Sequence, residues 1–421
     1  MKSKIILIYF FIFLGTNLFS QKKYNSILLE NGYLHIGNGQ VLETALIGIK
    51  NGKIVLVKNV LAYTYNKTEW DTIIDLKGQQ VYPGFVAPNS TLGLTEIEAV
   101  RATNDFREIG VFNPHVRAQI AYNAESNVLS TIKTNGVLIT QSCPRGEVVS
   151  GSSAVMYTDG WNWQDATVKA EDGIHLNWPR SFEEKGKKNE NYESQKREIY
   201  QFFENAKAYS KVSDNIKTDF RFEAMKNCFK GEKRVYIHAN TIQQLLDVID
   251  FATKMNLTFP VIVGGYDSYL ILPKLRDALI PVMLPRVHSL PENEEDPTDL
   301  PYKLPYLLQS GGVKFCLQNE GDMEAMQARN IPFLAGTAMT YGLSEEEAIR
   351  SISLSSCEIM GVGKTNGSVE EGKDATFFVS SGNALDMRTN NIVLAFVNGK
   401  IISLNNSQME LYKKYAEKLK K

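Results

Sequence analysis

The sequence contains little histidine and little cysteine, which limits the metal chemistry open to it. Of its 421 residues only 5 are histidine and 4 are cysteine. The cysteines are widely scattered and form no CxxC pair, which excludes a zinc ribbon and a dense disulfide framework. Buried free thiols are the expected state, although one pair could form a bridge in an oxidising compartment. These residues are Cys143, Cys228, Cys316 and Cys357.

The chain also lacks an excess of charge of one sign. Its 46 basic and 47 acidic residues give a net charge of −1. No basic run stands out, so nucleic acid and anionic membrane surfaces are not expected partners. Neither a G-x-S-x-G motif nor a phosphate-binding glycine loop occurs, and no Ser-His-Asp or Cys-His arrangement has local support. A small-molecule or protein partner is therefore expected.

The longest apolar run lies at the start of the chain. Lys2 and Lys4 precede an apolar stretch over residues 5–14, and Ser20 stands at a plausible cleavage point. This pattern is typical of a secretory signal peptide over residues 1–20, and the run is short for a membrane span. The sequence therefore predicts an exported protein, periplasmic or extracellular, with no membrane span after cleavage.

Short strand-like segments occupy both ends of the mature chain, over residues 21–80 and 362–405. Apolar and polar residues alternate there, and Asn-Gly pairs punctuate the pattern at Asn31-Gly32, Asn51-Gly52 and Asn398-Gly399. Asn-Gly between alternating apolar residues is a strong hairpin signal. We expect a β-sandwich domain built from both chain ends, followed by a basic amphipathic helix over residues 406–421.

Between these ends, residues 81–361 alternate between strand-like and helix-like segments. Amphipathic helices are expected over residues 241–256 and 344–361, and a polar loop over residues 143–156. Repeated strand–helix units of this length indicate an α/β protein with a TIM-like (β/α)8 barrel, here inserted in the β-sandwich domain. The expected buried parallel strands are GVLITQS (136–142), RVYIHAN (234–240), PVIVGG (260–265), IPVML (280–284) and VKFCLQN (313–319).

Several motifs, taken in order, resemble the metal-dependent amidohydrolase superfamily, in particular its imidazolonepropionase-like and related cyclic-amide and dipeptide hydrolases. The similarity runs from about residue 53 to about residue 402. It is carried by NGKIVLV, VYPGFV, IHA, YGLSEEEAIRSISLSSCEIMGV, NGSVEEGKDATFFV and LDMRTNNIVLAFVNGKII. The resemblance implies a (β/α)8 barrel with one or two divalent metals at the carboxyl ends of its strands. In that family the metals activate a water that attacks an amide, lactam or ester carbon.

Most of the metal ligands that the resemblance implies are missing. Asn89 and Thr91 stand where the first strand would carry an HxH pair. Their neutral oxygens suit hard cations better than zinc. His238 matches the fifth-strand histidine, whereas Gly264 stands where the sixth-strand histidine belongs. The Lys or Glu of the fourth strand has no recognisable counterpart.

Two alignments compete for the eighth strand and its aspartate. If GTA (336–338) is aligned with the family's GTD, the acid has become Ala338. We prefer VKFCLQNEG (313–321), because IPFLAGTAMTYGLS (331–344) then forms the helix that follows the eighth strand. Glu320 then stands near the aspartate position as the candidate catalytic acid. One histidine and one carboxylate fall short of the three protein ligands typical of catalytic zinc.

Other polar residues at predicted strand ends are candidates for a substrate or ligand pocket. Arg145, in the polar loop, could hold a carboxylate bidentately. Trp161 and Trp163 lie in a loop and could add aromatic surface. The remaining candidates are Asn240, Tyr266, Asp267, Arg286, Gln318 and Asn319.

The other histidines allow one rebuilt metal site. His175 and His288 fall in predicted loops that could reach the barrel mouth and join His238 and Glu320. His35 is expected at the surface of the terminal domain. His115 precedes a predicted helix and is expected to cap or pack against it.

Two functions from different classes follow. The first is an exported amidohydrolase-like protein with a degenerate metal site, a pseudoenzyme that binds a small molecule or a homologous amidohydrolase subunit and needs no cofactor. The alternative is a divergent hydrolase of carbon–nitrogen bonds, in dipeptides or cyclic amides, with a rebuilt mononuclear zinc site. A homodimer is compatible with either.

Overall fold

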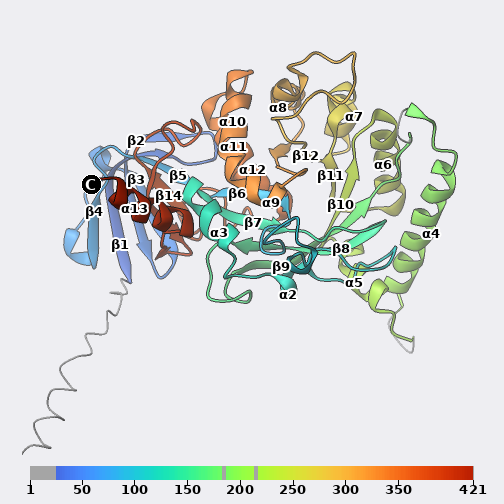
Figure 1. Ribbon diagram of the computed structural model, residues 1–421, viewed down its shortest axis with the longest axis horizontal. Helices are drawn as coiled ribbons and strands as arrows, with labels where there is room; N and C mark the ends of the chain where they lie inside the picture. The colour runs from blue at the N-terminus through green and yellow to red at the C-terminus, as the bar shows by residue number, and fades with distance from the viewer. Residues whose placement is uncertain (1–24, 183–185, 213–216, 421) are drawn as a thin grey trace, which may run out of the picture.

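The computed structural model describes residues 25–182, 186–212 and 217–420, and contains two eight-stranded sheets (Figure 1). The first sheet draws its strands from both ends of the chain. The second is formed by the middle of the chain and curls into a nearly closed barrel. The predicted signal peptide lies outside the described residues. Within them, no helix is both long enough and apolar enough to cross a membrane.

The terminal sheet runs β16-β15-β14-β5-β1-β2-β3, with β4 paired to β1. Its inward side chains form a core separate from that of the barrel, and Phe377 and Phe396 are fully buried there. The strands are β1 (Ser26–His35), β2 (Val41–Lys50), β3 (Lys53–Asn59), β4 (Thr72–Asp75), β5 (Gln80–Pro83), β14 (Phe377–Ser380), β15 (Ile392–Val397) and β16 (Lys400–Ile401).

Two of the three predicted hairpin turns are present, and one prediction was wrong. Asn51-Gly52 joins β2 to β3, and Asn398-Gly399 joins β15 to β16, in antiparallel pairs. Asn31-Gly32 instead lies inside β1, where Asn31 has φ 62° and the register with β2 shifts. The left-handed residue makes a β-bulge there, which bends the strand without ending it.

The barrel sheet runs β6 to β13 in chain order, without a hydrogen-bonded closure between β13 and β6. Neighbouring strands are parallel except around β8, which is antiparallel to both β7 and β9. The described sheet is therefore a mixed variant of the predicted all-parallel barrel. Its strands are β6 (Phe85–Ser90), β7 (Val137–Ser142), β8 (Val149–Tyr157), β9 (Thr167–Asn177), β10 (Arg234–Ala239), β11 (Pro260–Gly264), β12 (Val282–Leu284) and β13 (Phe315–Leu317).

The β7–β8–β9 meander corrects the prediction of a polar loop over residues 143–156. Only residues 143–148 connect the strands, and β8 is buried along its whole length. The serines of β8 looked like loop residues, but they are hydrogen-bonded inside the protein. The Ser153 hydroxyl, for example, donates to Asp172 at 2.8 Å.

Helices surround the barrel on the side of β10–β13 and stand between its two edge strands (Figure 1). The predicted helix over 344–361 is in fact two helices, α11 and α12, that meet at Ile352 and Ser353. The Ile352 carbonyl accepts a hydrogen bond from the Val86 amide of β6 at 2.8 Å, and α12 also contacts β13, so this segment bridges the two edge strands. The α-helices are α2 (Ala118–Ala121), α3 (Asn127–Ile132), α4 (Tyr192–Ser210), α5 (Phe220–Phe229), α6 (Ile242–Met255), α7 (Leu272–Asp277), α8 (Leu300–Ser310), α9 (Glu324–Gln327), α10 (Ile331–Thr340), α11 (Glu345–Ser351), α12 (Leu354–Met360) and α13 (Ser407–Leu419).

Candidate functional site

Asn89, at the carboxyl end of β6, is the centre of a polar network at the barrel mouth. It is buried and has φ 47°, a left-handed conformation that asparagine tolerates better than most residues. Its side-chain amide donates to Glu320 at 2.8 Å, and its side-chain oxygen accepts from Arg145 at 2.9 Å. The register of β6 with β7 shifts at this point. Asn89 therefore links an acid and a base that lie far apart in the sequence.

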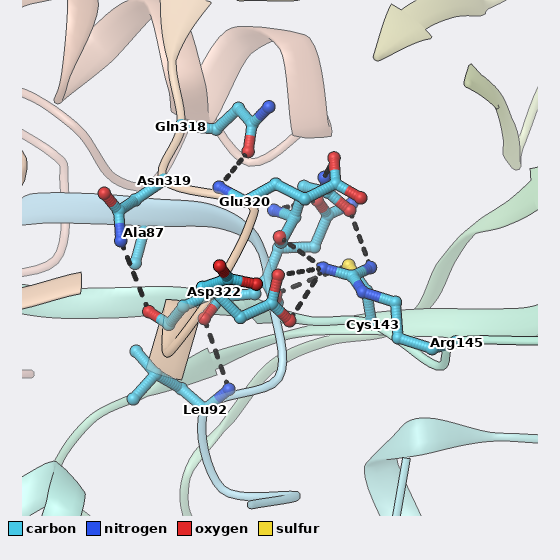
Figure 2. A network of polar contacts seen from close by, with 12 residues as sticks. Ala87, Leu92, Cys143, Arg145, Gln318, Asn319, Glu320 and Asp322 are labelled. Carbon is cyan, nitrogen blue, oxygen red and sulfur yellow. Dashed lines mark hydrogen bonds and ion pairs between the residues drawn. The ribbon is translucent and has the colours of Figure 1, made fainter. Parts of the chain in front are cut away.

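Arg145 enters the mouth from the short connection between β7 and β8. Its Nη2 donates to the Asn89 carbonyl at 2.8 Å and to both carboxylate oxygens of Glu324, at 2.9 and 3.0 Å. Figure 2 shows Arg145 and Glu320 within this network. Burial by itself would lower the pKa of the guanidinium, but Glu324 and Glu320 raise it, so Arg145 stays charged. The cationic charge at the mouth is thus supplied by the protein.

Glu320, His238 and His175 form a line that leads from the mouth into the barrel. Glu320 Oε1 lies 3.9 Å from His238 Nδ1, and His238 Nε2 lies 3.0 Å from His175 Nδ1. His175 is fully buried and stacks on Tyr236, with ring centroids 4.8 Å apart. The prediction that His175 sits on a loop was wrong, because it lies within β9, the fourth strand of the sheet. Its Nε2 atom is buried without a partner.

Burial and neighbouring charges give Glu320 a different charge state from His238 and His175. Burial lowers the pKa of His238 to about 4, with Glu320 opposing the shift. Burial lowers the pKa of His175 as well, and the neighbouring His238 adds to the effect. For Glu320, burial alone would raise the pKa, but Arg145, His238 and the Asn89 amide together lower it. Near neutral pH, Glu320 is therefore ionised and both imidazoles are neutral.

A cavity of about 250 Å³ opens beside this network. Thr91, Arg145, Glu320 and Glu324 contribute polar lining, and Phe106 contributes apolar lining. It lies where the strands of barrel proteins end and their ligands bind. A second cavity, of about 460 Å³, lies by Phe259 and Pro260 at the amino ends of β10 and β11, away from the network.

The similarity to known proteins is clearest at the carboxyl-terminal part of the chain and in the fold. Residues 302–402 match the model of the amidohydrolase family. The structure of an amidohydrolase from Thermotoga maritima MSB8 is similar with a TM-score of 0.78 and 23% identity, covering 90% of this chain and 99% of that one. The carboxyl-terminal part of the chain thus resembles the amidohydrolase family in sequence, and the described chain has the fold of an amidohydrolase. No curated protein shows a significant sequence match.

Two other solved structures share the fold alone with this chain. A prolidase complexed with N-methylphosphonate-L-proline has a TM-score of 0.53 at 14% identity, covering 90% of this chain and 99% of that one. A Xaa-Pro dipeptidase with bound methionine has a TM-score of 0.51 at 14% identity, covering 90% of this chain and 100% of that one.

The side chains at the barrel mouth do not fit a divalent metal. Among residues 25–182, 186–212 and 217–420, no group of three or more His, Cys, Asp and Glu side chains is placed to hold one ion. His238 uses opposite ring nitrogens toward Glu320 and His175, so these groups do not converge on a point. The side-chain oxygen of Asn89 already accepts from Arg145 at 2.9 Å, so it is not free to ligate a cation at the first-strand position.

The fourth and sixth strands offer no further ligand. The carboxyl end of β9 carries His175 and Asn177, without a Lys or Glu. On β11, Gly264 has φ 95°, and a Cβ there would lie 2.2 Å from the Asn240 Oδ1 atom. The backbone of the sixth strand has therefore adapted to glycine, and a histidine would require it to move. The eighth strand is β13, as the preferred alignment predicts, and the alternative GTA segment lies in α10.

Three of the predicted pocket residues hold loops in place and do not join the network. The Tyr266 hydroxyl donates to Asp296 at 2.8 Å, which fastens the acidic loop before α8. Asp267 accepts from the Ile242 amide at the start of α6. Arg286 donates to the carbonyls of the segment after β13, at 3.1 Å.

Two other predicted pocket residues lie close to the site, but their side chains make hydrogen bonds to backbone atoms. Gln318 accepts from the Glu320 amide at 2.6 Å, and the Asn319 side chain donates to the Glu324 carbonyl at 3.4 Å. Figure 2 shows both beside Glu320. These two hydrogen bonds fix the course of the backbone after β13, and with it the position of Glu320. The exposed Trp161 lies in the turn before β9, without a role in this network.

The remaining histidines lie outside the network. His288 is exposed, and its Nε2 lies 2.7 Å from the Thr337 hydroxyl of α10. His35 was expected at the surface, but it is buried, stacks on Tyr82 and contacts Glu346 at 2.6 Å. His115 is exposed in the loop before α2.

Sequence reasoning missed Glu324, the carboxylate that holds Arg145. The residue begins α9, 179 positions after Arg145 in the chain. One signal was available: a charged arginine predicted at a barrel mouth needs a buried acid nearby, and Glu324 follows the eighth strand.

Proposed function

We propose that this chain is a non-catalytic member of the amidohydrolase superfamily that binds a small molecule in the cavity beside Glu320. The single observation that carries the proposal is the position of Arg145, whose guanidinium is bonded to Asn89 at the first-strand ligand position. The guanidinium thus occupies the Asn89 oxygen that would face a metal, and it cannot ionise a water as a metal does. The cavity favours a small molecule over a subunit as the ligand. We further propose that the protein is exported, on the basis of its amino-terminal sequence.

A second function has one observation in its favour. Two imidazoles and one carboxylate, from His175, His238 and Glu320, lie in line within 3.0 and 3.9 Å of each other. If these side chains rotated toward one point, they would supply the ligands of a rebuilt mononuclear zinc site. That site would support a hydrolase acting on the carbon–nitrogen bonds of dipeptides or cyclic amides.

Metal analysis of the purified protein separates the two functions. The protein is equilibrated with zinc or manganese, dialysed, analysed for bound metal, and assayed with a panel of dipeptides and lactams. We expect substoichiometric metal and no hydrolysis, in the wild type and in His238→Ala alike. The matched control is His288→Ala, which removes an exposed imidazole outside the network.

The result that would overturn the proposal is stoichiometric metal that is lost in His238→Ala and kept in His288→Ala. Hydrolysis of any member of the panel with the same dependence on His238 would establish the rebuilt enzyme instead.

A further inference from the structure

The charge of the cavity beside Glu320 defines what it can accept. Arg145 contributes one positive charge, but its Nη2 atom already contacts both oxygens of Glu324, which neutralises it. Glu320 and Glu98 also line the cavity, and no further basic side chain does. The neutral imidazole of His238 adds no positive charge. Three carboxylates and one guanidinium therefore line the cavity, and their net charge is two negative.

The lining also contains a buried hydroxyl without a partner. Thr95 is 5% exposed and lines the cavity, and its Oγ1 atom makes no hydrogen bond. A buried hydroxyl without a partner costs free energy, which a ligand that donates a hydrogen bond would recover. This observation is independent of the acidic side chains, and it points to the same kind of ligand.

Part of the lining is apolar and limits the size of the ligand. Phe106, Ala325 and Met326 form this part, and Phe106 and Met326 are half-buried. The volume of about 250 Å³ lies below the ~300–1,000 Å³ range of most ligand pockets. A compact aliphatic group would fill the apolar part while a polar head meets the carboxylates.

From these observations we infer that the cavity is selective for a small organic cation, an aliphatic ammonium whose head lies between Glu320 and Glu98 and donates to Thr95. The inference rests on the proposed binding function and gives it a ligand class. The ammonium brings a positive charge to an acidic lining and a donor to the Thr95 hydroxyl, and its alkyl group packs on Phe106 and Met326.

The test compares probes that share one alkyl group and differ in charge: 3-methylbutylammonium, 3-methylbutan-1-ol and 3-methylbutanoate. Binding to the full protein is measured at neutral pH by calorimetry or ligand-observed NMR, with and without EDTA. We expect the ammonium to bind at least about 10-fold more tightly than the alcohol, and the carboxylate not to bind, because a charged hydrogen bond exceeds a neutral one by about that factor.

Three variants locate the site. Glu98→Gln changes an exposed residue that holds no part of the network, and it should weaken the ammonium about 2- to 5-fold, the range of an exposed ion pair. Glu320→Gln should weaken it roughly 10- to 100-fold. The matched control is Glu43→Gln, an exposed change on β2 of the other sheet, and it should leave binding unchanged.

Binding of the carboxylate as tightly as the ammonium, binding of none of the probes, or equal effects of Glu98→Gln and Glu43→Gln would each overturn the inference. These outcomes are distinct from failure of the proposed function. Inert, metal-free protein without a preference for cations refutes only the ligand class. Stoichiometric metal with hydrolysis refutes the proposed function, whatever the probes show.

Discussion

Replacing Arg145 by methionine tests whether the protein's own cation holds the barrel mouth together. The side chains of Arg145 and Glu324 are only 20% and 11% exposed, and their closest atoms are 2.9 Å apart. Methionine keeps most of the volume but removes the charge and the donors. Glu324 is then left buried without its counter-ion, and the Asn89 carbonyl loses a hydrogen bond. Breaking a buried pair from one side costs about 3–5 kcal/mol of unfolding free energy. Because Arg145 is partly exposed, we expect about 3 kcal/mol.

The second arm of this experiment removes both charges. In Arg145→Met combined with Glu324→Leu, no charge is left buried and apolar contacts replace the pair. The double variant should recover most of the loss and lie within about 1–2 kcal/mol of the wild type. The matched control is Arg388→Met, which breaks an exposed pair with Asp386 in which the arginine is 84% exposed. Its loss should be much smaller than that of Arg145→Met, because solvent screens an exposed pair.

The assay is urea-induced unfolding followed by tryptophan fluorescence, since the buried Trp178 reports on the barrel. If Arg145→Met were no more costly than Arg388→Met, the guanidinium would contribute nothing specific at the mouth. If the double variant were as unstable as the single one, the loss would arise from packing, and the electrostatic argument would fail.

Three further predictions concern protonation, backbone strain and the thiols. Because burial lowers the pKa of His238 to about 4 from 6.5, the unfolded chain binds a proton in that range that the folded protein does not. The unfolding free energy should therefore fall, by up to about 3 kcal/mol, as the pH drops from 6.5 to 4, and urea titrations of His238→Asn should show a shallower dependence. Gly264→Ala should destabilise the protein by at least about 1–3 kcal/mol, and by more than Gly78→Ala, whose φ of 80° has open space around it; equal losses in thermal unfolding would contradict the close contact at Gly264. All 4 cysteines are free and buried, so a thiol reagent should label them only after denaturation, and labelling of fewer than 4 in the unfolded, unreduced protein would reveal a disulfide.

The apolar strands of the barrel were predictable because burial on both faces requires continuous apolar runs. All five expected strands overlap described ones, from β7 to β13. β8 was missed because it satisfies its polar side chains internally: Ser153 donates to Asp172, and Tyr236 contacts the same carboxylate. A local sequence pattern contains no information about such distant partners.

The sequence could place individual site residues at strand ends, but it could not predict which of their side chains contact one another. Asn89, His238, Gly264 and Glu320 could be assigned to strand ends by position alone. The contacts between Arg145 and its partners depend on strands that are adjacent only after the barrel closes. The sequence could therefore indicate which ligands are missing, but not that a guanidinium stands among them.

The origin of the terminal sheet from both chain ends has a consequence for synthesis on the ribosome. β5 pairs with β14 through residues that lie almost 300 positions apart, Gln80 with Ser380 and Pro83 with Phe377. The hairpins of β1–β3 can form as soon as they are made, but one edge of β5 has no partner until the barrel is complete. Chains synthesised from the amino terminus must therefore keep an unpaired apolar strand edge through most of translation. The emerging protein therefore needs protection from aggregation at a strand of which the finished protein buries Val81, Tyr82 and Pro83.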